Sequence, residues 1–189
     1  MSRPCDLDAI EARRLIGNKK LSPLELTKSC IEQIEKLNPS INAVVAINNA
    51  DVLKQAKKAE DDVMSGSELG LLHGLPVGIK DLNIVKNLRS TSGSKIYENR
   101  IPESDDTIVE DIRSEGAIIF CKTNTPEFGA GGNTKNFVYG ATSNPFDLTK
   151  TPAGSSGGSA AALACNMMPL ANGSAVSYTH LRAHETLPY

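Results

Sequence analysis

The chain has 189 residues, of which 40% are hydrophobic and 22% charged, a balance typical of one soluble globular domain. A net charge of -2 gives no basic surface for direct binding of nucleic acid or of an anionic membrane, and no apolar run is long enough to span a bilayer. The four cysteines are scattered, without metal-ligand spacing, and the N-terminus has no apolar signal core. We therefore expect a cytoplasmic protein with reduced thiols, no metal and no cofactor.

The first 66 residues predict a scaffold made mainly of helices. Apolar residues at near-helical spacing indicate a short helix over residues 6–16. Ser22, followed by a proline and Glu25, has the pattern of a capping box and begins a second helix, which we expect to end at residues 38–39. The other elements expected here are a strand over residues 43–47 and a helix over residues 51–64.

The next segment places charge at the end of an apolar run. Residues 71–79 predict a buried strand that ends abruptly on Lys80 and Asp81. Open α/β sheets place ligands beyond the carboxyl ends of their strands, which makes Lys80 a candidate for chemistry. The alternative is that Lys80 leaves the core to pair with Asp81 or with solvent. A helix capped by Ser104 and a buried strand over residues 117–121 complete a β-α-β unit, so the expected fold class is α/β.

Residues 151–164 run from a cluster of glycines and serines directly into a small apolar segment. Gly154, Gly157 and Gly158 permit φ values closed to other residues, and the alanine-rich segment favours a helix. Backbone N–H groups would then converge at a helix N-terminus, where anions or oxyanions bind. The alternative is a flexible Gly/Ser linker. Neither this loop nor residues 129–132 has the spacing of a dinucleotide fingerprint or the lysine of a Walker loop.

Three separated stretches resemble the motifs of one enzyme family, the amidase signature hydrolases. They read LHGLPVGIKD at residues 72–81, KTNTPEFGAG at residues 122–131 and YGATSNPFDLTKTPAGSSGGS at residues 139–159. The resemblance covers residues 6–174 and includes the spacing between the motifs, although Ala153 replaces a common glycine. It implies a mixed central sheet flanked by helices, incomplete in this chain, and an enzyme that hydrolyses the C–N bond of small carboxamides.

Members of that family use a triad of a nucleophilic serine, a serine on a cis peptide and a lysine. The resemblance assigns the lysine to Lys80 and the cis-serine to Ser155, which follows Gly154, with Ser156 supporting the network. A lysine acts as a base only where burial or positive neighbours keep it neutral. Ser155 would pass the proton from a nucleophile that forms an acyl-enzyme, while backbone N–H groups stabilise the oxyanion.

The resemblance stops after Ser174. In family register an aspartate, a variable residue, two glycines and the catalytic serine should follow, but residues 176–178 lack glycine and Thr179 stands at the nucleophile position. Side chains there would obstruct close backbone approach to a substrate. We therefore expect residues 1–174 to be the N-terminal part of an amidase signature domain, residues 175–189 to be an aberrant tail from truncation or a chimeric reading frame, and the chain to be inactive.

Two other functions remain open. The chain could be a fragment of the glutaminase subunit of a tRNA-dependent amidotransferase, although that subunit more often has asparagine where this chain has Leu82. It could also be a non-catalytic anion-binding module that uses residues 154–158. The sequence predicts neither the amide substrate nor the oligomeric state.

Overall fold

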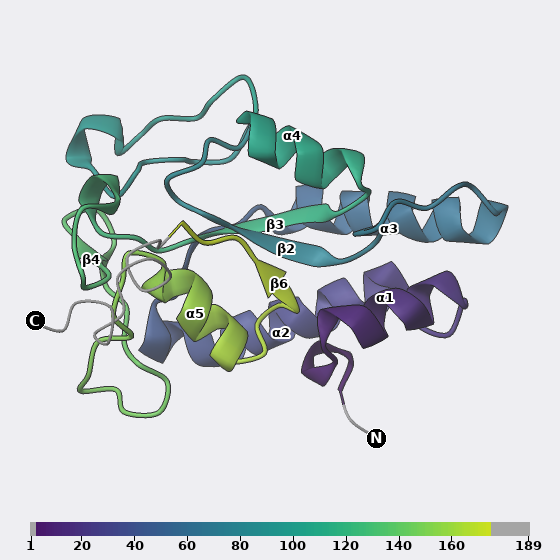
Figure 1. Ribbon diagram of the computed structural model, residues 1–189, viewed down its shortest axis with the longest axis horizontal. Coiled ribbons are helices and arrows are strands. Elements are labelled where there is room, and N and C mark those ends of the chain that lie inside the picture. The colour runs from purple at the N-terminus through teal and green to yellow at the C-terminus, as the bar shows by residue number, and fades with distance from the viewer. Residues whose placement is uncertain (1–2, 175–189) are drawn as a thin grey trace, which may run out of the picture.

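A four-stranded mixed sheet organises residues 3–174, the part of the chain that the computed structural model describes (Figure 1). Its strands are β1 (Val44–Ala46), β2 (Pro76–Lys80), β3 (Ile118–Thr123) and β6 (Leu170–Ala171). The strand order is β1-β3-β2-β6. β2 runs parallel to both of its neighbours, whereas β1 pairs antiparallel with β3 at the edge. The carboxyl ends of β2, β3 and β6 therefore lie at the same end of the sheet.

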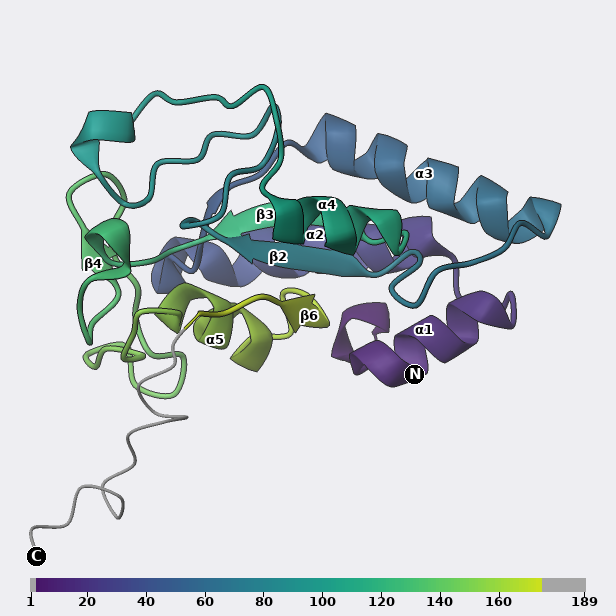
Figure 2. The same cartoon turned by 45° about the horizontal axis from the view of Figure 1, so that its top comes forward.

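Helices cover both faces of this sheet (Figures 1 and 2). α4 lies over one face, and α2 and α5 lie over the other. No helix of residues 3–174 has both the length and the apolar composition needed to cross a bilayer. The helices are α1 (Ala9–Gly17), α2 (Pro23–Ile41), α3 (Asn49–Ser65), α4 (Thr107–Ser114) and α5 (Gly157–Ala164), with short 3-10 turns η1 (Pro4–Asp6), η2 (Lys95–Tyr97) and η3 (Glu127–Gly129) and a small hairpin of β4 (Lys135–Asn136) and β5 (Gly140–Ala141).

Each face of the sheet has its own apolar core. Val77 and Ile79 of β2 pack with Val109 of α4 in the smaller core. The larger core joins α1, α2, α3 and α5 to the other face of β3, where Phe120 is fully buried. Because side chains alternate along a strand, Lys80 follows Ile79 onto the opposite face, towards α5.

The expected α/β class and the β-α-β unit are confirmed, because β2, α4 and β3 follow one another and the two strands are parallel. The strand predicted over residues 43–47 and the helices over residues 6–16 and 51–64 are present, with ends that differ by a few residues. All four cysteines are buried and free.

Two helix boundaries were predicted wrongly. α2 continues through Pro39 to Ile41, because a proline in the last turn removes only one hydrogen bond and Asn42 then ends the helix in the left-handed conformation. α4 begins after Asp106 instead of at Ser104. The Asp106 carboxylate accepts the backbone N–H of Ile84 at 2.8 Å, so tertiary contacts hold this segment outside the helix.

Candidate active site

Lys80 ends β2 among three serine hydroxyl groups. Its side chain is fully buried. The Lys80 Nζ atom lies 2.8 Å from Ser155 Oγ, 3.0 Å from Ser156 Oγ and 2.8 Å from Ser174 Oγ. Ser155 and Ser156 come from the loop that precedes α5, and Ser174 follows β6. Three segments that are distant in sequence thus meet at one amine.

The surroundings of this amine disfavour its charged form. Burial lowers the pKa of Lys80 from 10.5 to about 8. None of the ion pairs within residues 3–174 involves Lys80, so hydroxyl oxygens are its polar contacts. An amine with this pKa is partly neutral near pH 8 and can accept a proton from a hydroxyl group.

Asn172 holds the backbone of Lys80 in place. The Lys80 N–H donates to Asn172 Oδ1 at 2.6 Å, and Asn172 Nδ2 donates to Asn83 Oδ1 at 2.9 Å. The Asn172 carbonyl accepts the Ser159 hydroxyl of α5 at 2.8 Å, and Ser159 Oγ lies 2.7 Å from Thr123 Oγ1 of β3. One asparagine therefore connects the ends of β2 and β6 to α5.

The sequence did not single out Asn172 or Ser174 as site residues. Their place follows from the parallel pairing of β2 with β6, which sets Val77 opposite Leu170 and Gly78 opposite Ala171. Residues after β6 then lie beside the residues that end β2. A two-residue strand gives no periodic signal, so nothing in the sequence revealed this pairing.

The loop before α5 has the backbone that the resemblance implied. The peptide bond between Gly154 and Ser155 is cis. Ala153, which stands at a common glycine position of the resembled family, has a φ of 62° in the left-handed region. The Ala153 carbonyl accepts the Thr134 hydroxyl at 2.9 Å, which ties the loop to the segment before β4. The structure thus brings Ser155 of this loop to the amine of Lys80.

The three glycines of this loop do not have the unusual φ values for which the sequence singled them out. Gly154, Gly157 and Gly158 are not among the residues with positive φ. Two of them allow close approach instead: a Cβ atom on Gly157 would overlap the Thr134 side chain, and one on Gly158 would overlap the backbone of Asn124. The Gly157 N–H also donates to Thr134 Oγ1 at 3.0 Å, so this amide at the N-terminus of α5 already has a partner. Anion binding by the loop stays a prediction.

A second buried lysine, Lys122 of β3, forms an ion pair with Asp81. The Lys122 Nζ atom lies 3.3 Å from Asp81 Oδ1, and both side chains are fully buried. Lys122 also donates to the Asn83 carbonyl and to Ser90 Oγ, while Asp81 accepts the N–H and hydroxyl of Thr91. Burial lowers the pKa of Lys122, and the Asp81 carboxylate opposes that change.

The partner of Asp81 is therefore Lys122 and not Lys80, so the alternative interpretation of Lys80 was wrong. Strand register separates the two lysines: Ile79 pairs with Lys122 and Lys80 pairs with Thr123, so the lysines lie on opposite faces of the sheet. Lys122 was not predicted as a site residue, although a lysine within an apolar strand was a visible signal.

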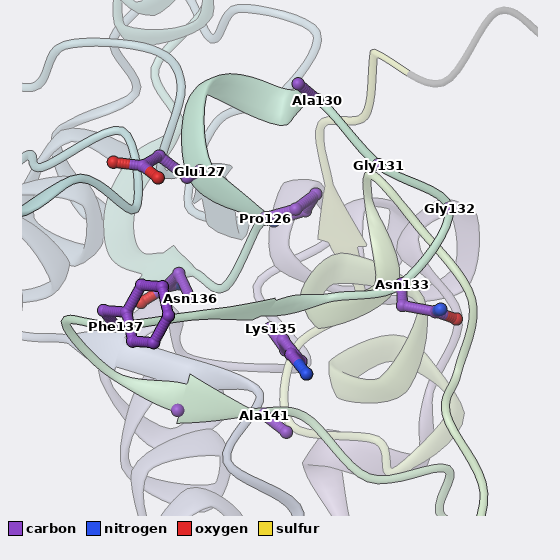
Figure 3. Close-up of a pocket in the computed structure, with 11 residues that line it drawn as sticks. Pro126, Glu127, Ala130, Gly131, Gly132, Asn133, Lys135, Asn136, Phe137 and Ala141 are labelled. Atoms are coloured by element: carbon purple, nitrogen blue, oxygen red, sulfur yellow. The ribbon is translucent and has the colours of Figure 1, made fainter.

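A cavity of about 470 Å³ lies beside the serine loop (Figure 3). Residues 126–127 and 130–133 form part of its wall, and the hairpin of β4 and β5 supplies the rest. Figure 3 shows Lys135 and Asn136 on β4, with Pro126 and Glu127 on the neighbouring segment. A Cβ atom on Gly154 would lie 3.2 Å from Asn133, so this wall adjoins the loop that carries Ser155.

The position expected for the nucleophile, Thr179, lies outside the described residues, as do residues 175–178. Within residues 3–174 no three His, Cys, Asp or Glu side chains cluster in a way that could hold a metal ion. The described part of the site therefore consists of an amine, three hydroxyl groups and the asparagine that accepts the backbone N–H of Lys80.

Comparisons with known proteins agree on one family. The sequence pattern of the Amidase family matches residues 25–177. A glutamyl-tRNA(Gln) amidotransferase subunit of Clostridium botulinum (strain Eklund 17B / Type B) is 42% identical over 165 residues, which cover 87% of this chain and 34% of that protein. The chain thus spans about a third of the length of the curated relatives that it matches.

Two solved structures share the fold. An amidase crystal structure superposes with a TM-score of 0.84 and 31% identity, over 91% of this chain and 39% of that one. A bacterial aryl acylamidase of the amidase signature family gives a TM-score of 0.81 and 33% identity, over 87% of this chain and 34% of the other. The described fold corresponds to a part of each of those larger structures.

Proposed function

The chain belongs to the amidase signature family, and from this premise we propose that it carries the base and the proton relay of an enzyme that hydrolyses carboxamide C–N bonds. The observation that supports this most is the contact of 2.8 Å between Lys80 Nζ and Ser155 Oγ. Because the pKa of Lys80 is lowered to about 8, its amine is available as a base at a pH where an ordinary lysine is protonated.

In the proposed reaction, Lys80 Nζ accepts the proton of Ser155 Oγ as Ser155 accepts the proton of a nucleophilic hydroxyl. That hydroxyl oxygen attacks the amide carbonyl carbon and forms a tetrahedral intermediate. The C–N bond then breaks, and the relay returns a proton to the departing amine or ammonia. Water hydrolyses the acyl-enzyme by the same relay. Ser156, whose Oγ accepts from Lys80 and from the Ser174 N–H, holds the amine in position.

We further propose that this chain does not itself hydrolyse amides. Thr179 stands at the nucleophile position by motif match, and residues 176–178 lack the glycines that would let the backbone donate to an oxyanion. In this proposal residues 1–174 are the N-terminal part of an amidase signature domain, and residues 175–189 are a non-family tail. The activity therefore belongs to a longer parent protein.

Restoration of the missing parts tests this proposal. Amide hydrolysis is measured for this chain and for a version that carries Ala175→Asp, Ser177→Gly, Tyr178→Gly, Thr179→Ser and the remainder of an amidase signature domain. We expect ammonia release from small carboxamides by the restored version, and a loss of about 100-fold or more with Lys80→Met. Hydrolysis by the unrestored chain would refute its inactivity. A restored version that is unaffected by Lys80→Met would refute the assigned base.

A second candidate is glutamine hydrolysis within a tRNA-dependent amidotransferase. The identity of 42% to the Clostridium botulinum amidotransferase protein favours it, compared with 31% and 33% to the two amidase structures. Leu82 after the Lys80–Asp81 pair argues for a general amidase. Glutaminase assays on the restored version separate the two, because glutamine hydrolysis stimulated by partner subunits and charged tRNA is expected only of the amidotransferase.

A further inference from the structure

We propose that Ser174 is an acyl acceptor in this chain, and that it reacts with activated acyl and phosphonyl compounds, aryl esters and fluorophosphonates, but not with amides. The inference rests on the proposed function in one respect, the role of Lys80 as a base. The nucleophile is different from that of the proposed amidase reaction. Ser174 passes its proton directly to Lys80, so it needs neither Ser155 as a relay nor the nucleophile loop.

The geometry around Ser174 supports this assignment. Its Oγ lies 2.8 Å from Lys80 Nζ, the same distance as Ser155 Oγ. Ser174 is exposed, whereas Ser155 and Ser156 are only partly so. The Ser174 N–H donates to Ser156 Oγ at 3.0 Å, and Asn172, two residues earlier, accepts the backbone N–H of Lys80 at the end of β2. The hydroxyl group is therefore both held against the amine and accessible to a reagent.

The chemistry limits the reaction to activated compounds. Lys80 Nζ accepts the Ser174 proton while Ser174 Oγ bonds to the carbonyl carbon of an aryl ester. The bond between that carbonyl carbon and the aryloxy oxygen breaks, the aryloxide leaves with the electron pair, and the Lys80 ammonium or water protonates it. With a fluorophosphonate, Oγ bonds to phosphorus and fluoride leaves. An amide requires oxyanion stabilisation and a protonated leaving amine, and the Ser174 N–H is already engaged with Ser156.

Covalent labelling of the purified chain tests the proposal. The chain is treated with an alkyl fluorophosphonate, and the modified peptide is identified by mass spectrometry. We expect one adduct, on Ser174, which Ser174→Ala abolishes and which Ser104→Ala leaves unchanged, since Ser104 is an exposed serine remote in sequence from the site. The initial release of 4-nitrophenol from 4-nitrophenyl acetate should likewise be abolished by Ser174→Ala and left unchanged by Ser104→Ala. An adduct on Ser155, on Ser156 or within residues 175–189, or no adduct at all, overturns the proposal.

The pH profile tests the role of the amine without depending on a variant that folds. The labelling rate should rise with pH and level off above about 8, the pKa of Lys80. A rate that follows hydroxide concentration without levelling off overturns the assignment. Lys80→Met should slow labelling about 100-fold. If Ser174 is not labelled while the restored version hydrolyses amides with Lys80 as base, this inference fails alone. If Lys80→Met changes neither the labelling rate nor the rate of amide hydrolysis, both this inference and the proposed function are refuted.

Discussion

Replacement of Lys80 by methionine should stabilise the folded protein at neutral pH, and the gain should shrink as the pH rises. The side chain of Lys80 is fully buried at the end of β2, and burial lowers the pKa of its amine from 10.5 to about 8. Below pH 8 the folded chain must therefore hold a proton that it binds less tightly than the unfolded chain does. Methionine has a similar length and no charge, so it removes this penalty.

The difference between the folded and unfolded pKa values of Lys80 determines how large this stabilisation should be. A change from 10.5 to about 8 corresponds to about 3 kcal/mol at 1.36 kcal/mol per pH unit. Between these two values the unfolded state binds more protons, so the stability of the wild type rises with pH through this window. The hydrogen bonds from Lys80 to the serines, which methionine also removes, offset part of the gain at every pH. The difference between the effects of Lys80→Met at pH 7 and pH 10 should be about 2.5 kcal/mol.

Urea unfolding followed by far-UV circular dichroism measures this difference, since the chain has no tryptophan for fluorescence. With a slope of about 2 kcal/mol/M, the midpoint difference between the two chains should change by about 1 M from pH 7 to pH 10. Lys54→Met, at an exposed lysine of α3, is the matched control and should show no such change. A pH-dependent difference below about 0.5 kcal/mol, or of opposite sign, would refute the desolvation of Lys80.

Three further stability predictions can be checked by the same unfolding measurement. Lys122→Met should lower the free energy of unfolding by about 3–5 kcal/mol, because it leaves Asp81 buried without its ion-pair partner. The double variant Lys122→Met with Asp81→Asn should recover part of this loss. Equal free energies of unfolding for the single and the double variant would contradict the ion pair. Ala153→Gly should stabilise by about 0.5–1 kcal/mol, because φ of Ala153 is 62° and glycine adopts this left-handed conformation without strain. A lower free energy of unfolding for Ala153→Gly would show that the alanine is not strained there. Gly158→Ala should destabilise by about 1–3 kcal/mol, because the added Cβ atom meets the backbone of Asn124 after β3. Gly132→Ala is the control and should not destabilise, because a Cβ atom there meets nothing within 4 Å. Similar effects of the two substitutions would argue against close packing of Gly158 on Asn124.

Local signals in the sequence were sufficient for most helix and strand positions. The side chain of Ser22 accepts the N–H groups of Leu24 and Glu25, as the capping pattern predicted, and Gly66 ends α3 in the left-handed conformation. Both features depend on residues within one turn of the chain. The start of α4 could not be read in this way, because Asp106 is bound by a backbone group 22 residues earlier.

The candidate site divides along the same line. The abrupt end of an apolar strand on Lys80, and the glycines and serines before an apolar helix, were visible in the sequence and carried the family resemblance. Tertiary structure decided which groups meet. The strand register sends Lys80 to the α5 face and Lys122 to the α4 face, so Asp81 pairs with the second lysine. The pairing of β6 with β2 brings Ser174 to the amine of Lys80. Strand pairing joins residues that are distant in sequence, so a single sequence identified the reactive residue types but not their partners.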